Sequence, residues 1–169
     1  PKAHPGKYYV RLNVGESSLT ESFEILKDKR SMSSKDDLKE QFEFLIGIRD
    51  KVTEIHKTIK QIRSTRDQLT SLDGKLDDSH EEISNSIKDV VNKITKIEQN
   101  LYQTKNRSGQ DPLNFPIRLN NKLAHLSSVA GRGNFRPTDQ MYGVRDELVE
   151  LIDIELKKWN EIKDSELDK

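Results

Sequence analysis

The feature that most constrains the fold is a run of apolar residues spaced alternately by four and three positions. Its members are Ile83, Ile87, Val90, Ile94, Ile97 and Leu101. This spacing places all six side chains on one face of an α-helix, whereas a half-buried strand alternates every second residue. The run therefore predicts an amphipathic helix from about residue 79 to residue 105 that packs against other helices.

A longer stretch with the same periodicity precedes this helix. Its apolar positions are Leu38, Phe42, Leu45, Val52, Ile55, Ile59, Ile62, Leu69 and Leu72. Ser34 with Asp37 three residues later forms a variant of the capping box, and Asp73-Gly74 ends the pattern. We predict one helix of about 35 residues here, antiparallel to the next because residues 74–78 form a short reversal.

The first third of this helix is apolar around most of its circumference, at Phe42, Phe44, Leu45, Ile46 and Ile48. A helix that is apolar on several sides packs on several sides. We therefore expect the N-terminal hairpin described below to lie across this end, opposite the other helices.

Two further helices follow a connection rich in Gly, Pro and Asn. A shorter third helix should begin at Pro116 or just after it and stop at Gly131, since Pro suits a first turn. Thr138 should cap a fourth helix that runs nearly to the end of the chain.

The N-terminal residues have strand periodicity instead. Residues 7–14 alternate between apolar and polar, and residues 19–26 resume the alternation after the turn at Gly15. They predict a β-hairpin, which is marginal alone and needs a further packing surface. The fold class is thus mainly α: a β-hairpin and then an antiparallel bundle of three long helices and one shorter one.

Composition excludes several classes of function. Charged residues make up 34% and apolar residues 32%, which leaves only a thin core, and 29 basic residues balance 29 acidic ones. A general nucleic-acid or anionic-membrane binder would carry a basic excess. There is no Cys and no apolar run of membrane-spanning length, so we expect neither a zinc-thiolate site nor membrane insertion.

Charge is unevenly divided along the second half. Residues 101–136 hold six bases and one acid, a net of +5, whereas residues 139–169 hold ten acids and five bases, a net of −5. We expect these segments to be neighbours that complement each other inside the bundle. The alternative, a polyanion site, lacks the interleaved aromatic residues that a single-strand platform uses.

No catalytic or metal-binding pattern emerges. His4, His56, His80 and His125 are scattered outside any His-x₃-His or HExxH spacing. The 73–78 turn lacks the alternating oxygen ligands and final Glu of a calcium loop. We predict no enzyme activity, no cofactor and no metal.

The run from Gly109 to Leu123 is unusually rich in Asn, Arg and Asp among Lys/Glu helices. Its candidate interaction residues are Gln110, Asp111, Asn114, Arg118, Asn120 and Asn121. They either grip a ligand or partner, or tie a buried loop to neighbouring helix ends, since buried backbone groups need partners. We favour the structural interpretation.

Four stretches resemble the C-terminal region of large bacterial BNR-repeat proteins, labelled glycosyl hydrolases or sortilin (VPS10)-like propeller proteins. They are Pro5–Leu12, Phe23–Ile25, Lys27–Arg30 and the run SGQDPLNFPIRLNNKL at residues 108–123. In that family, β-propellers are followed by a small β-domain, whose last hairpin has a PGxYxVxL pattern, and then by a helical tail. No catalytic residue of the family has a counterpart here.

The resemblance implies that residues 1–30 end a β-sandwich domain and that residues 31–169 form the helical bundle of an exported protein. The upstream propeller and β-domains would then be the partners of this module. An isolated hairpin without those strands could pair with a second copy, because exposed strand edges recruit other strands.

The sequence thus predicts a non-catalytic C-terminal accessory or interaction module of a larger propeller protein. A ligand-sensing bundle is the first alternative and needs a polar cavity near Asn114, Arg118 and Tyr142. An enzyme on the same scaffold is the second, and it needs clustered, strongly perturbed carboxylates or histidines.

Overall fold

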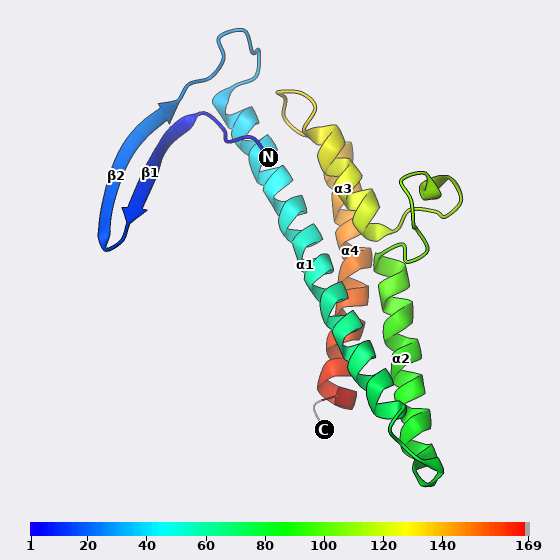
Figure 1. The fold of residues 1–169 in the computed structure, drawn as a ribbon. Coiled ribbons are helices and arrows are strands. Elements are labelled where there is room, and N and C mark those ends of the chain that lie inside the picture. Colours follow the sequence, from blue (N-terminus) through cyan, green and yellow to red (C-terminus); the bar gives the residue numbers. More distant parts are fainter. Residues whose placement is uncertain (168–169) are drawn as a thin grey trace.

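The computed structural model describes residues 1–167, apart from the side chain of Asp78, and has the predicted fold class (Figure 1). A two-stranded hairpin precedes four α-helices. The strands are β1 (Gly6–Val14) and β2 (Ser17–Ile25), and the helices are α1 (Lys35–Asp73), α2 (Glu81–Leu101), α3 (Leu119–Ala130) and α4 (Asp139–Ile162). Single turns lie at Asp78–His80 and Asp111–Leu113, and a π-helical turn, Lys163–Leu167, extends α4.

The predicted caps fix the ends of the two longest helices. The Ser34 hydroxyl accepts from the Asp37 backbone N–H at 3.0 Å, and the Asp37 carboxylate accepts from the Ser34 N–H at 2.8 Å, completing a capping box for α1. The Thr138 hydroxyl likewise accepts from the backbone N–H of Met141 at the start of α4. These bonds satisfy N–H groups that a helix leaves open at its first turn.

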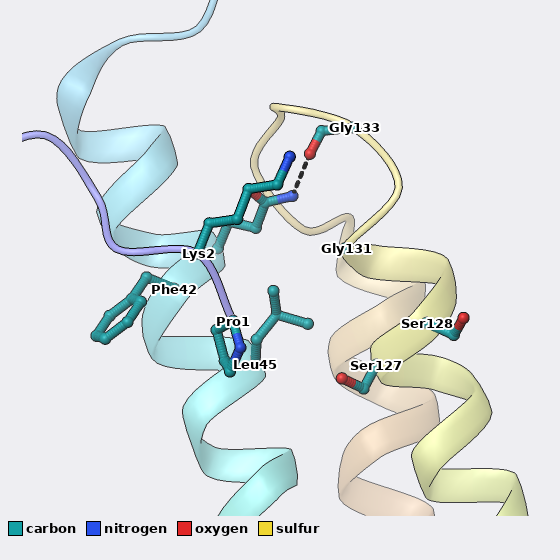
Figure 2. Close-up of a pocket in the computed structure, with 9 residues that line it drawn as sticks. Pro1, Lys2, Phe42, Leu45, Ser127, Ser128, Gly131 and Gly133 are labelled. Atoms are coloured by element: carbon teal, nitrogen blue, oxygen red, sulfur yellow. Dashed lines mark hydrogen bonds between the residues drawn. The ribbon is translucent and has the colours of Figure 1, made fainter. Parts of the chain in front are cut away.

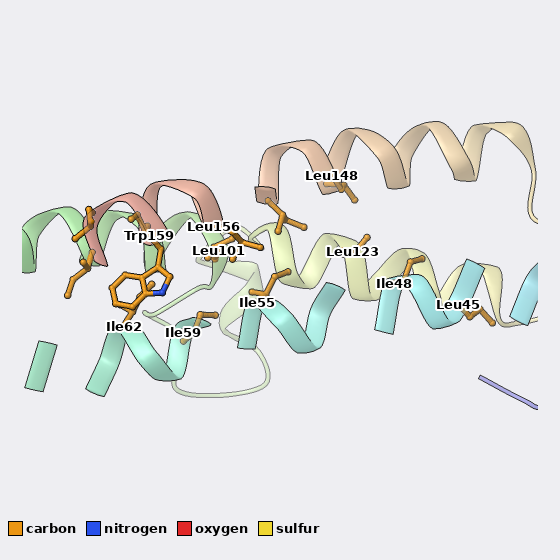
Figure 3. Close-up of a cluster of buried hydrophobic side chains, with 14 of the residues drawn as sticks. Leu45, Ile48, Ile55, Ile59, Ile62, Leu101, Leu123, Leu148, Leu156 and Trp159 are labelled. Carbon is orange, nitrogen blue, oxygen red and sulfur yellow. The ribbon is translucent and has the colours of Figure 1, made fainter. Parts of the chain in front are cut away.

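One continuous apolar core joins the four helices (Figure 3). Ile55 and Ile62 of α1, Ile94 of α2 and Ile152 of α4 are fully buried. Leu123 of α3 and Trp159 of α4 are buried in the same cluster. The four–three spacing of α2 therefore does mark its buried face, although Ile83, at its start, is half exposed.

Two helix boundaries differ from the prediction. The helix expected to reach residue 105 ends at Leu101, and the third helix, expected to begin at Pro116 or just after it, begins at Leu119. At the first of these ends the buried Gln103 amide donates to the Pro116 carbonyl at 2.8 Å and accepts from the Lys105 N–H at 3.2 Å. These bonds join the residues that follow α2 to those that precede α3, in the connection where neither helix continues.

The placement predicted for the hairpin was wrong. The strands project away from the bundle instead of lying across α1 (Figure 1). The residues before the hairpin, not the strands, contact this end of α1: the His4 ring packs edge-on against Phe42 with centroids 5.3 Å apart. Ile46, like Phe42, is half-buried. Phe44, Leu45 and Ile48 are buried in the bundle core.

Residues 101–136 and the C-terminal segment were expected to be neighbours of complementary charge. They are neighbours, since α3 packs on α4, but among the described residues no ion pair joins them. Two acids of the C-terminal segment pair with other helices, Asp153 with Lys51 of α1 at 2.8 Å and Glu166 with Lys93 of α2 at 3.0 Å. Arg136 pairs with Glu40 of α1, so the balance of charge is spread over the bundle.

Within residues 1–167, no helix has the length and apolar character needed to cross a bilayer.

Candidate functional site

Asp111, in the loop between α2 and α3, organises its own turn. Its carboxylate accepts from the backbone N–H groups of Arg107 and Ser108, the latter at 2.9 Å, and from the Ser108 hydroxyl at 2.9 Å. The backbone bonds from Arg107 and Ser108 lower the pKa of Asp111 below its ordinary value. Both oxygens of the ionised side chain therefore accept hydrogen bonds within this turn, which they stabilise.

Arg118 and Asn120 lie at the N-terminal end of α3. Asn120 is buried, and its amide Nδ2 lies 3.3 Å from Nε2 of His56. Its Oδ1 and the Arg118 Nε are buried without a protein partner. Buried polar atoms of this kind normally bind a water or another polar group.

The other candidate residues do not converge on this point. Gln110, Asn114 and Asn121 have exposed side chains on the outside of the loop and of α3. The run therefore divides into an inner pair, Arg118 and Asn120, and an outer set exposed to solvent.

The polar cavity that a ligand-sensing bundle requires is not assembled from the expected residues. Tyr142 donates to Glu40 at 2.8 Å and packs edge-on against Phe44, near the start of α1. Arg118 instead lines a groove with Asn100 of α2 and Leu151 of α4, at the opposite end of α3. Burial and the bond to the Glu40 carboxylate raise the pKa of Tyr142, which keeps the phenol protonated.

A buried ion cluster between α1 and α2 was not predicted from the sequence. The Glu98 side chain is 2% exposed and accepts from Arg63 Nε at 2.6 Å and from an Arg66 guanidinium N–H. The Arg63 guanidinium also lies over the Tyr102 ring, 5.3 Å from its centroid. Glu98 directly follows Ile97 of the apolar series, and this position was the available signal that a carboxylate enters the helix interface.

A pocket of about 400 Å³ lies where the N-terminal residues, α1 and the end of α3 meet (Figure 2). Leu45 and Phe42 form its α1 wall, and Ser127 lies on α3. The Gln41 amide donates to the carbonyls of Ala130 at 2.7 Å and Gly133 at 2.8 Å. This amide therefore caps the C-terminal end of α3 and is already engaged.

Among the side chains that the structure describes, which exclude that of Asp78, no three His, Asp or Glu gather closely enough to hold a metal ion. His56, His80 and His125 are exposed, and His4 is half-buried against α1. His80 contacts Asp77 at 2.8 Å in the turn before α2, a local contact in which Ser79 also takes part.

The hairpin presents the clearest candidate surface, because its two faces differ in character. Cross-strand partners share a face, and the pairs Tyr8–Phe23 and Leu12–Leu19 lie on one face together with Val10 and Val14. The opposite face is polar and carries the pairs Lys7–Glu24, Tyr9–Ser22, Arg11–Thr20 and Asn13–Ser18. We call these the apolar face and the polar face of the hairpin.

The apolar face is uncovered. Leu12 and Leu19 are each 61% exposed, and Val14 is 66% exposed. Only the root of the face is anchored: the Tyr8 ring stacks on Phe23 at 5.9 Å, and its hydroxyl donates to the His4 carbonyl at 2.7 Å. An apolar sheet face of this kind normally packs on another layer.

No family model, curated protein or solved structure matches this chain. The resemblance to BNR-repeat proteins therefore depends on four stretches alone: Pro5–Leu12, Phe23–Ile25, Lys27–Arg30 and residues 108–123.

Proposed function

We propose that this chain is a non-catalytic interaction module, in which the hairpin supplies the docking face and the helical bundle is its rigid support. The observation that carries the proposal is the apolar face, whose Leu12–Leu19 pair is 61% exposed at both positions. Full burial of a side chain of this size stabilises by about 1.5–3 kcal/mol. A partner that covers the face therefore gains several such contributions together.

The separation of the hairpin from the core of the bundle supports this proposal. The bundle has its own apolar core, formed by residues of α1, α2, α3 and α4 without any strand residue. The polar face of the hairpin resembles the outer face of a two-layer β-structure, which stays in water when the inner face is covered. Docking through the apolar face would thus leave the bundle unchanged and keep a polar surface outside.

On the resemblance alone, we place this module in a larger exported BNR-repeat propeller protein, whose β-domain would cover the apolar face. In the absence of such a domain, a second copy of the hairpin is the competing occupant.

Photo-crosslinking from single positions tests the proposal. A photoreactive amino acid is incorporated in place of Leu12 in the cells that make the protein. It should crosslink to the protein surface that covers the apolar face. The matched control is Ile83 on the bundle, which is 48% exposed but lies outside the hairpin. Equal crosslinking from both positions, or none from Leu12, would refute docking through the hairpin.

A further inference from the structure

One charged side chain interrupts the apolar face. Glu21 is paired with Val10, and this pair is the fifth of the nine that join the strands, at the centre of the hairpin. Its neighbours along the same face are the Leu12–Leu19 and Tyr8–Phe23 pairs. Within residues 1–167, no ion pair or hydrogen bond engages the exposed Glu21 carboxylate.

Any partner that covers the apolar face must accommodate this carboxylate. Taking an ionised group out of water without a compensating charge costs several kcal/mol. A cation placed opposite recovers much of that cost, and it fixes the register of the partner because only one position on the face is charged. The flanking apolar pairs would exclude water from the ion pair on both sides.

A second copy of the hairpin meets this requirement poorly. Because Glu21 lies in the central pair, a two-fold axis through the middle of the face brings two Glu21 carboxylates close together, whether the strands of the two copies run parallel or antiparallel. The like charges would lie at the middle of the interface, where repulsion is least screened.

We infer that the partner of the hairpin presents an apolar protein surface with one Lys or Arg at its centre, which pairs with Glu21. This inference rests on the proposed docking function and specifies the chemistry of the partner. It also assigns Glu21 two effects, since the same carboxylate selects a cationic partner and opposes self-association.

A charge-reversed copy of the chain supplies a defined probe, because it offers the same apolar face with a cation at the centre. Wild type and Glu21→Arg are each expected to be monomeric in sedimentation analysis, whereas an equimolar mixture should form a heterodimer. The matched control is Glu24→Arg, which reverses a charge on the same strand but on the polar face. The heterodimer should bind at least about tenfold more tightly than either homodimer, a difference of about 1.4 kcal/mol.

Three results would overturn the inference: a mixture that stays monomeric, a wild-type dimer as tight as the mixed dimer, or equal association with Glu24→Arg. A second arm separates this failure from failure of the proposed function. Glu21→Arg should abolish the Leu12 crosslink to the natural partner. If wild type and Glu21→Arg crosslink equally from Leu12, docking through the hairpin stands, but a partner cation paired with Glu21 is excluded. If wild type gives no crosslink from Leu12, the proposed docking function itself fails.

Discussion

The buried carboxylate of Glu98 offers a sharp test of how the bundle is held together. Its side chain is 2% exposed between Arg63 and Arg66, whose side chains are 49% and 26% exposed. Glu98→Gln keeps the shape but removes the charge and sets an amide donor against two guanidinium donors. Breaking one side of a buried ion pair costs about 3–5 kcal/mol. Because both arginines reach solvent, we expect a smaller loss, of about 2–4 kcal/mol.

Urea denaturation followed by circular dichroism measures this loss as a change in the free energy of unfolding. The matched control is Glu155→Gln on α4, a carboxylate whose side chain is 10% exposed and which pairs with Lys158 of its own helix at 2.7 Å. That pair is half in water at Lys158, so its loss should cost less than about 1 kcal/mol. Equal effects of the two variants, or a negligible effect of Glu98→Gln, would refute the claim that this cluster fastens α1 to α2.

Three further predictions concern the loop, the helix cap and the hairpin. Asn120→Ala should lower the free energy of unfolding in urea by about 1–3 kcal/mol, because it removes a buried side chain that contacts His56; unchanged stability would contradict the structural interpretation. The Ser34 hydroxyl and backbone lower the pKa of Asp37 in the folded chain. This contribution is therefore present above the unfolded pKa of about 4 and is lost as the pH falls through the lower folded pKa, so Asp37→Asn should flatten the acid limb of urea midpoints measured against pH. Leu19→Ser should leave the calorimetric Tm of the bundle unchanged, since the side chain is exposed and belongs to no core cluster; a clear drop would place the hairpin within the folding unit.

Features encoded by neighbouring residues could be predicted from the sequence. The capping box at Ser34, the cap at Thr138 and the stop of α3 at Gly131 all depend on residues within a few positions of the helix end. The spacing of Ile87, Val90, Ile94, Ile97 and Leu101 likewise marks a buried face without reference to any partner. Local rules thus locate the helices and the hairpin.

Features that depend on contacts between distant residues could not. The end of α2 at Leu101 reflects the bond from Gln103 to the Pro116 carbonyl, and no breaker residue announces it. The Glu98 cluster requires the relative register of α1 and α2, which spacing within one helix does not give. Residues 26–34 connect the hairpin to α1, and the sequence does not show how this connection orients one against the other. An apolar strand face and an apolar helix end therefore did not suffice to show that the two meet.

The same limit applies to the candidate site. The run from Gly109 to Leu123 was recognised as unusual, but only the structure separates the buried Asn120 from the exposed Gln110, Asn114 and Asn121. Conversely, the apolar face follows from alternation alone, whereas its exposure follows from the tertiary arrangement.

The proposed docking function requires that the chain itself leaves the apolar face of the hairpin uncovered. Nuclear Overhauser contacts from the methyl groups of Leu12 and Leu19, measured in dilute monomeric protein, report on this exposure. We predict contacts between the two side chains and none to the bundle, with His4–Phe42 as the contact between the N-terminal residues and α1. Contacts from either leucine to Phe42 or Ile46 would show that the hairpin folds back on α1, and they would contradict the account.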